Sequence, residues 1–231
     1  MSKSNAAHTA AVILAAGTGS RMRADTTKQR MLLLGKSVIY RTVAAFYASD
    51  SIDSITVVGR SEEMDFLRTE LTDFKEKLHA VVVGGDSRTE SASIGFKNIP
   101  ECATHVAIHD GARPLVTAEL IDRVVASAIE HGAATAASPI FDTVKRVKDG
   151  IIVATENRDE LYRAETPQVF GVDIYSRALQ CDADGVTDDN MLVERTGVAV
   201  HAVISGTVNL KITAPSDIKY AEFILKERDN V

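Results

Sequence analysis

The chain has 231 residues, of which 45% are hydrophobic and 25% are charged, and these values are ordinary for one large globular domain. No stretch approaches the roughly 20 apolar residues that a transmembrane helix needs, and a formal net charge of −6 disfavours nucleic-acid binding because phosphate-rich polymers attract basic surfaces. We therefore predict a soluble protein that binds neither membranes nor nucleic acids.

Neither the N-terminus nor the cysteines point to secretion or to a metal centre. The first ten residues lack an apolar stretch long enough for a signal peptide, so we expect a cytoplasmic protein. Cys102 and Cys181 are the only cysteines, and they lack the spacing of a zinc or redox motif. His105 and His109 share one expected strand without a third ligand of matching spacing, so we interpret them as structural.

Short apolar segments alternate with segments of helical periodicity through the first 131 residues. Expected strands cover 9–16, 54–58, 79–83 and 105–109, and expected helices cover 37–48, 62–72, 88–98 and 117–131. Strands with few polar residues, each followed by a helix, are typical of a parallel sheet that is covered on both faces. We predict a three-layer α/β/α sandwich in a single domain spanning residues 1–231.

The helix over 117–131 has the clearest boundaries. Its apolar residues form one stripe, consisting of Leu120, Ile121, Val124, Val125, Ala128 and Ile129. Thr117 is the expected N-cap, and Gly132 follows the last turn. The pattern indicates a helix that packs on the core.

The pattern changes after residue 132. Residues 142–157 alternate about Lys148-Asp149-Gly150, which predicts a projecting β-hairpin. Further strands are expected at 133–140, 198–203 and 208–213, and further helices at 172–181, 188–196 and 215–227.

A glycine-rich segment, LAAGTGSRM, follows the first expected strand. Gly17 and Gly19 let backbone amides approach an anion, and Arg21 adds a guanidinium. A tight strand-to-loop turn would explain the glycines alone equally well. Arg21 and Lys28 favour a triphosphate site, because the Lys28 ammonium could neutralise charge on a phosphoryl group under attack.

Two commoner glycine motifs are missing. A dinucleotide fingerprint needs a third glycine near position 22, which is Met22, and a Walker loop ending in Gly35-Lys36-Ser37 needs a glycine at position 30, which is Arg30. No Gly-x-Ser-x-Gly sequence offers a serine nucleophile. In-line phosphoryl chemistry needs no protein nucleophile and therefore remains possible.

Polar residues follow the third and fourth expected strands. The sequence 84–88 reads GGDSR, with Ser91 one turn into the next helix, and Asp110 and Arg113 follow the fourth strand. Open α/β sheets bind ligands at the carboxyl ends of their strands, and a carboxylate beside a guanidinium suits Mg²⁺ and phosphate. The simpler interpretation, in which Asp110 caps a turn and pairs with Arg113, stays open.

Eight sequence blocks occur in a specific order: LAAGTGSRM, TKQ, GGDSR, HDGARP, DTVK, ETPQVF, TDDNMLVE and NLKIT. Together they cover nearly the whole chain and resemble the 2-C-methyl-D-erythritol 4-phosphate cytidylyltransferase family of the non-mevalonate isoprenoid pathway. The resemblance implies a Rossmann-like nucleotidyltransferase fold that uses CTP and Mg²⁺. It also implies a homodimer in which the projecting arm reaches the partner subunit.

The implied reaction transfers a cytidylyl group from CTP to 2-C-methyl-D-erythritol 4-phosphate, giving 4-diphosphocytidyl-2-C-methyl-D-erythritol and pyrophosphate. By the same resemblance the nucleotide contacts are Ala15, Ala16, Gly17, Gly19, Gly85, Asp86, Ser91 and Asp110. Catalysis is assigned to Arg21, Lys28 and Lys211, and Mg²⁺ to Asp110. The acceptor contacts are Arg113, Thr143, Arg158, Thr166 and Thr187, with Arg158 serving the neighbouring subunit's site.

Four positions depart from the usual pattern of this family. Arg30 stands where an aromatic residue is usual, Ser37 where proline is common, Gly111 where alanine is frequent, and Glu165 where glutamine is usual. These departures concern substrate detail and not the class of reaction.

Three other functions were weighed. A cytidylyltransferase for another polyol phosphate, such as ribitol 5-phosphate, would share the nucleotide blocks. A non-catalytic nucleotide sensor would not need both lysines together with Asp110 and Arg158. An NAD-dependent oxidoreductase is disfavoured because the third glycine is missing.

Overall fold

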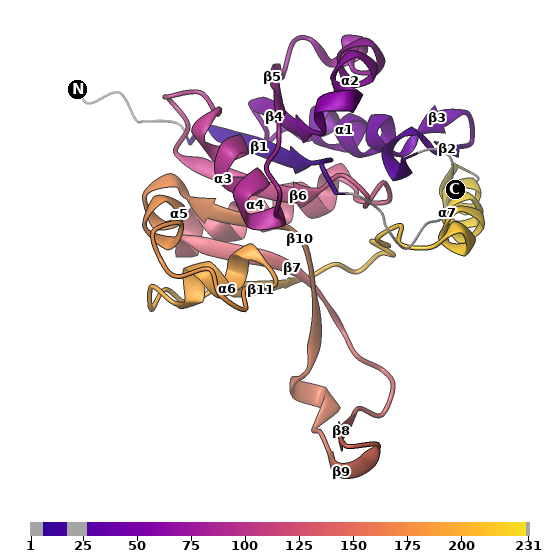
Figure 1. The fold of residues 1–231 in the computed structure, drawn as a ribbon, viewed down its shortest axis with the longest axis vertical. Helices are drawn as coiled ribbons and strands as arrows, with labels where there is room; N and C mark the ends of the chain where they lie inside the picture. Colours follow the sequence, from indigo (N-terminus) through magenta and orange to yellow (C-terminus); the bar gives the residue numbers. More distant parts are fainter. Residues whose placement is uncertain (1–6, 18–26, 230–231) are drawn as a thin grey trace.

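The computed structural model describes residues 7–17 and 27–229. A seven-stranded sheet forms its centre, in the order β11-β7-β10-β6-β1-β4-β5 (Figure 1). The strands are β1 (Thr9–Leu14), β4 (Ser54–Gly59), β5 (Leu78–Val83), β6 (His105–Asp110), β7 (Ala133–Pro139), β10 (Tyr162–Gly171) and β11 (His201–Ile204). Neighbours pair in parallel except at β10, which is antiparallel to β6 and β7. The mainly parallel sheet that we predicted is confirmed.

Helices cover both faces of the sheet. One face carries α1 (Val38–Ala48), α2 (Met64–Glu70) and α4 (Ala118–His131), and the other carries α3 (Arg88–Lys97), α5 (Val172–Ala178) and α6 (Asp189–Glu194). The last helix, α7 (Pro215–Asp229), packs on Leu33 of β2 (Leu32–Leu33), which pairs with β3 (Lys36–Ser37). Single 3₁₀ turns occupy Lys28–Arg30, Ser61–Glu63, Thr72–Phe74 and Arg158–Glu160.

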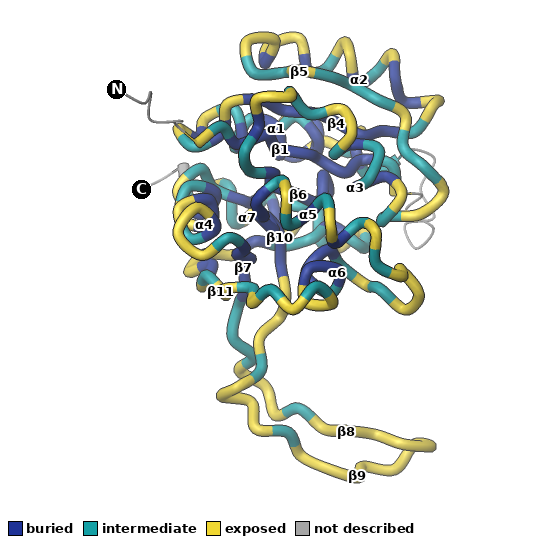
Figure 2. The backbone as a smooth tube through the Cα atoms, turned by 90° about the vertical axis from the view of Figure 1, so that its left-hand side faces the viewer, coloured by how far each residue is buried: buried dark blue, intermediate teal, exposed yellow. Residues whose placement is uncertain are grey.

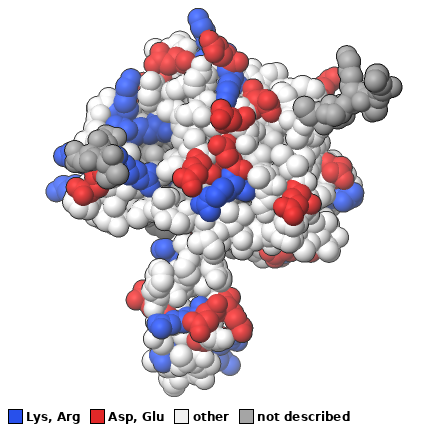
Figure 3. Space-filling view, turned by 180° about the vertical axis from the view of Figure 1, so that it is seen from behind, with Lys and Arg blue, Asp and Glu red and all other residues white. Residues whose placement is uncertain are grey.

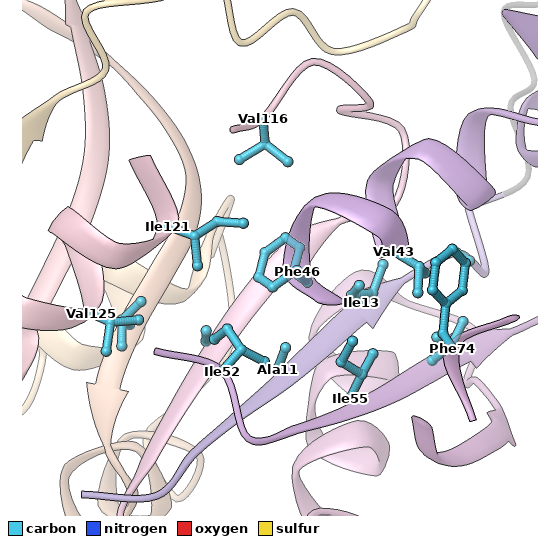
Figure 4. Packing of buried hydrophobic residues seen from close by; sticks show 14 of the residues in the cluster. Ala11, Ile13, Val43, Phe46, Ile52, Ile55, Phe74, Val116, Ile121 and Val125 are labelled. Carbon is cyan, nitrogen blue, oxygen red and sulfur yellow. The ribbon is translucent and has the colours of Figure 1, made fainter. Parts of the chain in front are cut away.

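Strand β1 shows why the sheet needs both layers. All six of its residues are buried, and they alternate between faces because successive side chains of a strand point to opposite sides. Ala11 and Ile13 join Phe46 and Ile55 in one core cluster (Figure 4). Val12 and Leu14 belong to the cluster on the opposite face. An apolar strand of this kind is stable only when helices cover both sides.

The predicted boundaries of α4 are confirmed. The Thr117 hydroxyl accepts the backbone N–H of Leu120 at 3.2 Å. Gly132 follows the helix with φ 89°, and its N–H donates to the Ala128 carbonyl. This left-handed conformation costs glycine nothing sterically.

The hairpin expected at 142–157 is present as an arm made of β8 (Lys145–Lys148) and β9 (Ile151–Thr155). Asp149 and Gly150 form its two-residue turn with φ 51° and 80°, the signs of a type I′ turn, which favours Asp-Gly. Every residue of both strands is exposed, and the arm stands clear of the body (Figure 2). Acidic and basic side chains mingle on its surface (Figure 3).

Two strand predictions need correction. Residues 208–213 form no strand, because the Ile212 amide donates to the Ala112 carbonyl beyond β6 at 2.7 Å instead of extending the sheet. Strand β10 was missed because Pro167 interrupts its apolar pattern, and its pairing with β7 shifts register between Ala164 and Gln168.

All four departures from the family pattern make specific contacts, and Glu165 accepts hydrogen bonds from Ser138, Ser205 and Asn209. Arg30 pairs with Glu63 at 2.8 Å. The Ser37 hydroxyl caps the N-terminus of α1. A Cβ at Gly111 would lie 3.0 Å from the Leu14 carbonyl oxygen, so this turn has little room for a larger residue.

Gly95 allows α3 to pack closely on the sheet. A Cβ at this position would overlap Val12 and lie 2.8 Å from the Cγ2 of Val58. We expect Gly95→Ala to lower the free energy of unfolding by roughly 1–2 kcal/mol, because overpacking outweighs the better helix propensity of alanine. Urea denaturation measures the change, and the partly exposed Ser93→Ala on the same helix is the control. A more stable Gly95→Ala protein would contradict this packing.

Candidate active site

A cavity of about 320 Å³ lies at the carboxyl ends of β1, β5 and β6, the edge where open α/β sheets bind ligands. Three segments bring the residues there: the loop after β1, the turn from β5 into α3, and the end of β6. A fourth, irregular segment adds Lys211 from far along the sequence. The lining consists of Leu14, Ala16, Gly17, Lys28, Gln29, Gly85, Asp86, Ser87, Arg88, Ser91, Asp110, Ala112 and Lys211.

Asp110 is the centre of the charges in this pocket. One carboxylate oxygen lies 2.8 Å from Lys211 Nζ and 3.6 Å from Arg113 Nε, and the other lies 3.3 Å from Arg88 Nε. Burial opposes ionisation of Asp110, but the charges of Arg88, Lys211 and Arg113 outweigh burial and hold the pKa of its carboxyl well below the usual range. Asp110 is therefore an anion at neutral pH.

The backbone of Asp110 is fixed from behind by His109 and Thr166. The Asp110 N–H donates to the Thr166 hydroxyl at 3.1 Å, and that hydroxyl lies 3.0 Å from His109 Nδ1. His109 Nε2 lies 3.4 Å from the Arg113 carbonyl, which only accepts, so Nε2 carries the proton and Nδ1 accepts from Thr166. Complete burial lowers the pKa of His109 to about 3, so the ring is neutral.

Arg88 links this pocket to the helix α6. Its Nη1 lies 2.6 Å from a carboxylate oxygen of Asp189, and the Tyr175 hydroxyl donates to the other oxygen at 2.6 Å. Burial disfavours the guanidinium charge, but Asp189 and Asp110 overcome burial and raise the pKa of Arg88. Arg88 therefore stays charged between two carboxylates.

Eight of the predicted site residues line the one cavity: Ala16, Gly17, Lys28, Gly85, Asp86, Ser91, Asp110 and Lys211. Ala15 is buried at 2% exposure and lies next to them, with its N–H bonded to the Val58 carbonyl of β4. Gly19 and Arg21 lie outside the described residues. The clustering of residues from positions 16 to 211 supports the nucleotide assignment.

The predicted acceptor residues do not all meet at this cavity. Arg113 lies beside Asp110 and lines a second cavity of about 770 Å³, which shares Lys211 with the first. Thr166 is 3% exposed and supports Asp110 from behind. Thr187 is exposed, with its hydroxyl 3.1 Å from Met191 Sδ.

Thr143 precedes β8 and Arg158 follows β9, at the two ends of the arm, and neither lines the cavity at the carboxyl ends of β1, β5 and β6. Both are exposed. Arg158 donates to the Phe141 carbonyl at 2.6 Å, at the root of the arm. Phe141 also lines the second cavity, so Arg158 lies beside a residue of that cavity.

Two functional residues were missed, Arg88 and Asp189. Both lie inside the blocks GGDSR and TDDNMLVE, but 101 positions separate them, so no spacing pattern could reveal their contact. The sequence offered one indirect signal for this contact, namely that a block with an arginine and a block rich in aspartates could supply the two partners of an ion pair.

A metal ion would have few protein ligands here. Within the described ranges no group of three or more His, Cys, Asp or Glu residues could hold a metal ion. Asp110 is a strand-end carboxylate in a pocket that is also lined by Lys28, Arg88 and Lys211. Mg²⁺ often binds through one or two carboxylates together with substrate phosphates and water. The donor set thus fits Mg²⁺ that arrives with a nucleotide.

The buried His109 predicts a pH dependence of stability. Its pKa is near 6.5 when unfolded and about 3 when folded, so between these values the unfolded chain binds more protons and stability falls as pH falls. Urea denaturation from pH 7 to 4.5 should show that His109→Gln loses stability less steeply than the wild type, by up to about 1.4 kcal/mol per pH unit. Equal slopes would contradict a neutral buried His109.

Comparisons with known proteins agree with this geometry. Residues 9–227 match the family model described as 2-C-methyl-D-erythritol 4-phosphate cytidylyltransferase. Among curated proteins of that name, the one from Thermosynechococcus vestitus is 41% identical over 94% of this chain and 95% of its own length. The one from Geobacter metallireducens is 40% identical over 94% of this chain and 97% of its own.

Solved structures give the same result. The crystal structure titled 4-diphosphocytidyl-2C-methyl-D-erythritol synthase from Anaerococcus prevotii superposes with a TM-score of 0.85 at 28% identity, covering 95% of this chain and 96% of that one. These matches span the sheet, the arm and the pocket segments. The chain therefore belongs to the 2-C-methyl-D-erythritol 4-phosphate cytidylyltransferase family.

Proposed function

We propose that this protein transfers the cytidylyl group of CTP to 2-C-methyl-D-erythritol 4-phosphate, giving 4-diphosphocytidyl-2-C-methyl-D-erythritol and pyrophosphate. The observation that carries the proposal is the joint lining of one strand-end cavity by Lys28, Lys211 and Asp110. Membership of the family supplies the substrates. No helix among the described residues has the length and hydrophobicity to span a bilayer, and CTP as co-substrate agrees with a cytoplasmic location.

The reaction is an in-line displacement at phosphorus. An oxygen of the acceptor phosphate forms a bond to the α-phosphorus of CTP while the bond from that phosphorus to the bridging oxygen breaks, and pyrophosphate leaves with that electron pair. No protein nucleophile is needed. Lys28 and Lys211 neutralise charge that spreads over the phosphoryl oxygens, and Gly85, Asp86 and Ser91 hold the nucleoside end so that attack is in line.

Asp110 has two tasks in this proposal. Mg²⁺, when bound with the nucleotide, would be held by Asp110 and would supply charge neutralisation at the phosphates. In the unliganded protein Asp110 holds the Lys211 ammonium at 2.8 Å, which keeps that cation beside the pocket. Arg21, outside the described residues, is proposed as a further phosphate contact.

We also propose that the enzyme works as a homodimer through the arm. Phe141 is 80% exposed at the root of the arm, and Ile151 and Ile152 on β9 are more than 60% exposed; apolar surface of this kind marks an interaction site. The acceptor contacts Thr143 and Arg158 do not line their own chain's strand-end cavity. Their use at the neighbouring subunit's pocket accounts for both facts.

Pyrophosphate release tests the function directly. Purified protein with Mg²⁺ is assayed with each of CTP, UTP, ATP and GTP against 2-C-methyl-D-erythritol 4-phosphate and ribitol 5-phosphate. We expect turnover only with CTP and 2-C-methyl-D-erythritol 4-phosphate, and loss of turnover when EDTA removes the metal. Turnover with ribitol 5-phosphate would replace the proposed acceptor, and no turnover at all would favour a nucleotide sensor.

The two lysines should matter for turnover more than for binding. We expect Lys28→Ala and Lys211→Ala each to lower kcat about 100- to 1000-fold, with a much smaller change in CTP affinity measured by calorimetry, because each stabilises charge that develops in the transition state. Lys97→Ala, an exposed lysine at the end of α3, is the matched control. Equal losses in affinity and kcat would contradict this role.

Mixing two inactive variants tests the shared site. Arg158→Ala and Lys28→Ala proteins are unfolded together, refolded as a mixture and assayed. Random pairing makes half of the dimers mixed, and each mixed dimer has one site with an intact pocket and an intact partner arm. We expect recovery of about a quarter of wild-type activity; no recovery beyond the separate variants would contradict a site completed by the partner.

A further inference from the structure

Glu165 is a buried carboxylate that the reaction outlined above does not use. It is 7% exposed on β10, where it lines the second cavity together with Arg113 and Lys211. It takes part in none of the ion pairs found among the described residues. Instead its oxygens accept three hydrogen bonds, from the Ser138 hydroxyl at 2.7 Å, the Ser205 hydroxyl at 2.6 Å and the Asn209 amide at 3.1 Å. A buried charge is costly without such donors, so packing alone does not account for a carboxylate here.

Two of these three donors belong to the irregular segment 205–211, which follows β11. The backbone of this segment is anchored at Ser205, whose N–H donates to the Ala137 carbonyl, and then just beyond its end at Ile212. Between those anchors it makes no regular secondary structure. Its position therefore depends on side-chain contacts, of which Glu165 receives two.

Asn209 connects Glu165 to Arg113, which lies beside Asp110 in the candidate active site. Its side-chain amide nitrogen donates to Glu165 and to the Thr166 backbone carbonyl, and the backbone carbonyl of Asn209 accepts from Arg113 Nη1 at 2.7 Å. Lys211 lies two residues further along and reaches Asp110 at 2.8 Å. Arg228 also bonds this segment, at the Val208 carbonyl, but from the side of α7. Among the described residues, Glu165 is the one side chain of the central sheet that receives two hydrogen bonds from this segment, beside the contacts of Ser205 and Asn209 with the backbone carbonyls of Ala137 and Thr166.

We propose that Glu165 is a positioning residue: its carboxylate holds segment 205–211 on the sheet so that Lys211 is presented to the phosphates of the nucleotide. The inference rests on the proposed cytidylyltransferase function for its effect on turnover. A displacement of about 1 Å in a group that stabilises the transition state costs up to about a hundredfold in rate. In this role Glu165 acts through Lys211.

Two substitutions at Glu165 separate its hydrogen bonds from its bulk. Glu165→Leu keeps similar volume without an acceptor, and we expect kcat to fall about 10- to 100-fold while the KM for CTP changes less than about threefold. Glu165→Gln should stay within about threefold of wild type, because its oxygen accepts from Ser205 and Asn209 while its NH₂ donates to the Ser138 hydroxyl. Wild-type kcat in a folded Glu165→Leu protein would overturn the proposal.

Ser138 and Ser205 each donate to a different oxygen of the Glu165 carboxylate. Substituting each serine gives a matched pair of variants that tests the proposal even if the Glu165→Leu protein does not fold. Ser205→Ala removes a contact to the segment, and Ser138→Ala removes a contact to β7 only. We expect a several-fold fall in kcat for Ser205→Ala and none for Ser138→Ala. Equal effects would assign Glu165 to general packing and overturn the proposal.

Coupling to Lys211 is the decisive measurement. In a Lys211→Ala background, Glu165→Leu should cause no further loss of kcat, because residues that act through one another are not additive; a full further loss would contradict action through Lys211. Hydrogen exchange of the backbone amides over 205–211 adds a readout that needs no turnover, and Glu165→Leu should speed it there. Unchanged exchange would overturn the positioning role, whereas an inactive wild type would refute only the proposed reaction.

Discussion

The contact of one carboxylate with three cations determines how this active site is built. Asp110 stands at the end of β6 and meets Arg88, Arg113 and Lys211, which come from three different parts of the chain. Without Asp110 these cations would repel one another across a partly buried pocket, and without the cations a buried carboxylate would be costly. The cluster carries excess positive charge that a triphosphate can complement, so the same residues that stabilise the unliganded site also favour the ligand.

Irregular backbone is what allows Lys211 to join this cluster. Residues 208–213 were expected to form a further strand. Instead the Ile212 N–H donates to the Ala112 carbonyl, just beyond β6. The hydrogen bonds of this segment go to side chains, chiefly Glu165, Arg113 and Arg228. Catalytic residues on such segments need rigid supports, because their backbone has no ladder of its own. The buried polar groups around β10 provide that support.

Local signals in the sequence predicted local structure well. The Thr117 cap, the Asp149-Gly150 turn and the apolar run of β1 each depend on neighbouring residues, and each was predicted from the sequence. The strand with Pro167 was missed, since its pairing is fixed by β6 and β7 and not by its own pattern. The contact of Arg88 with Asp189 was also missed, because 101 positions separate the two residues. Lys28 was proposed from its place after the glycine-rich segment, whereas Lys211 was identified only through the resemblance to a family, because nothing local in the sequence connects it to the pocket.

The buried polar residues around Asp110 contribute less to folding stability than apolar residues would, but they fix the positions of the charged groups. His109, Glu165 and Asp189 are all at most 7% exposed, and apolar residues of the same size would bury more favourable surface at these places. The polar groups fix orientation, because each hydrogen bond constrains an angle as well as a distance. His109 supports Asp110 through Thr166, Asp189 pairs with Arg88, and Glu165 bonds the segment that carries Lys211. The charge neutralisation that we propose needs those cations in place before the substrates arrive, because reorganising them during the reaction would raise the barrier. A rigid polar layer behind a strand-end pocket is therefore the structural counterpart of a reaction that uses no protein nucleophile.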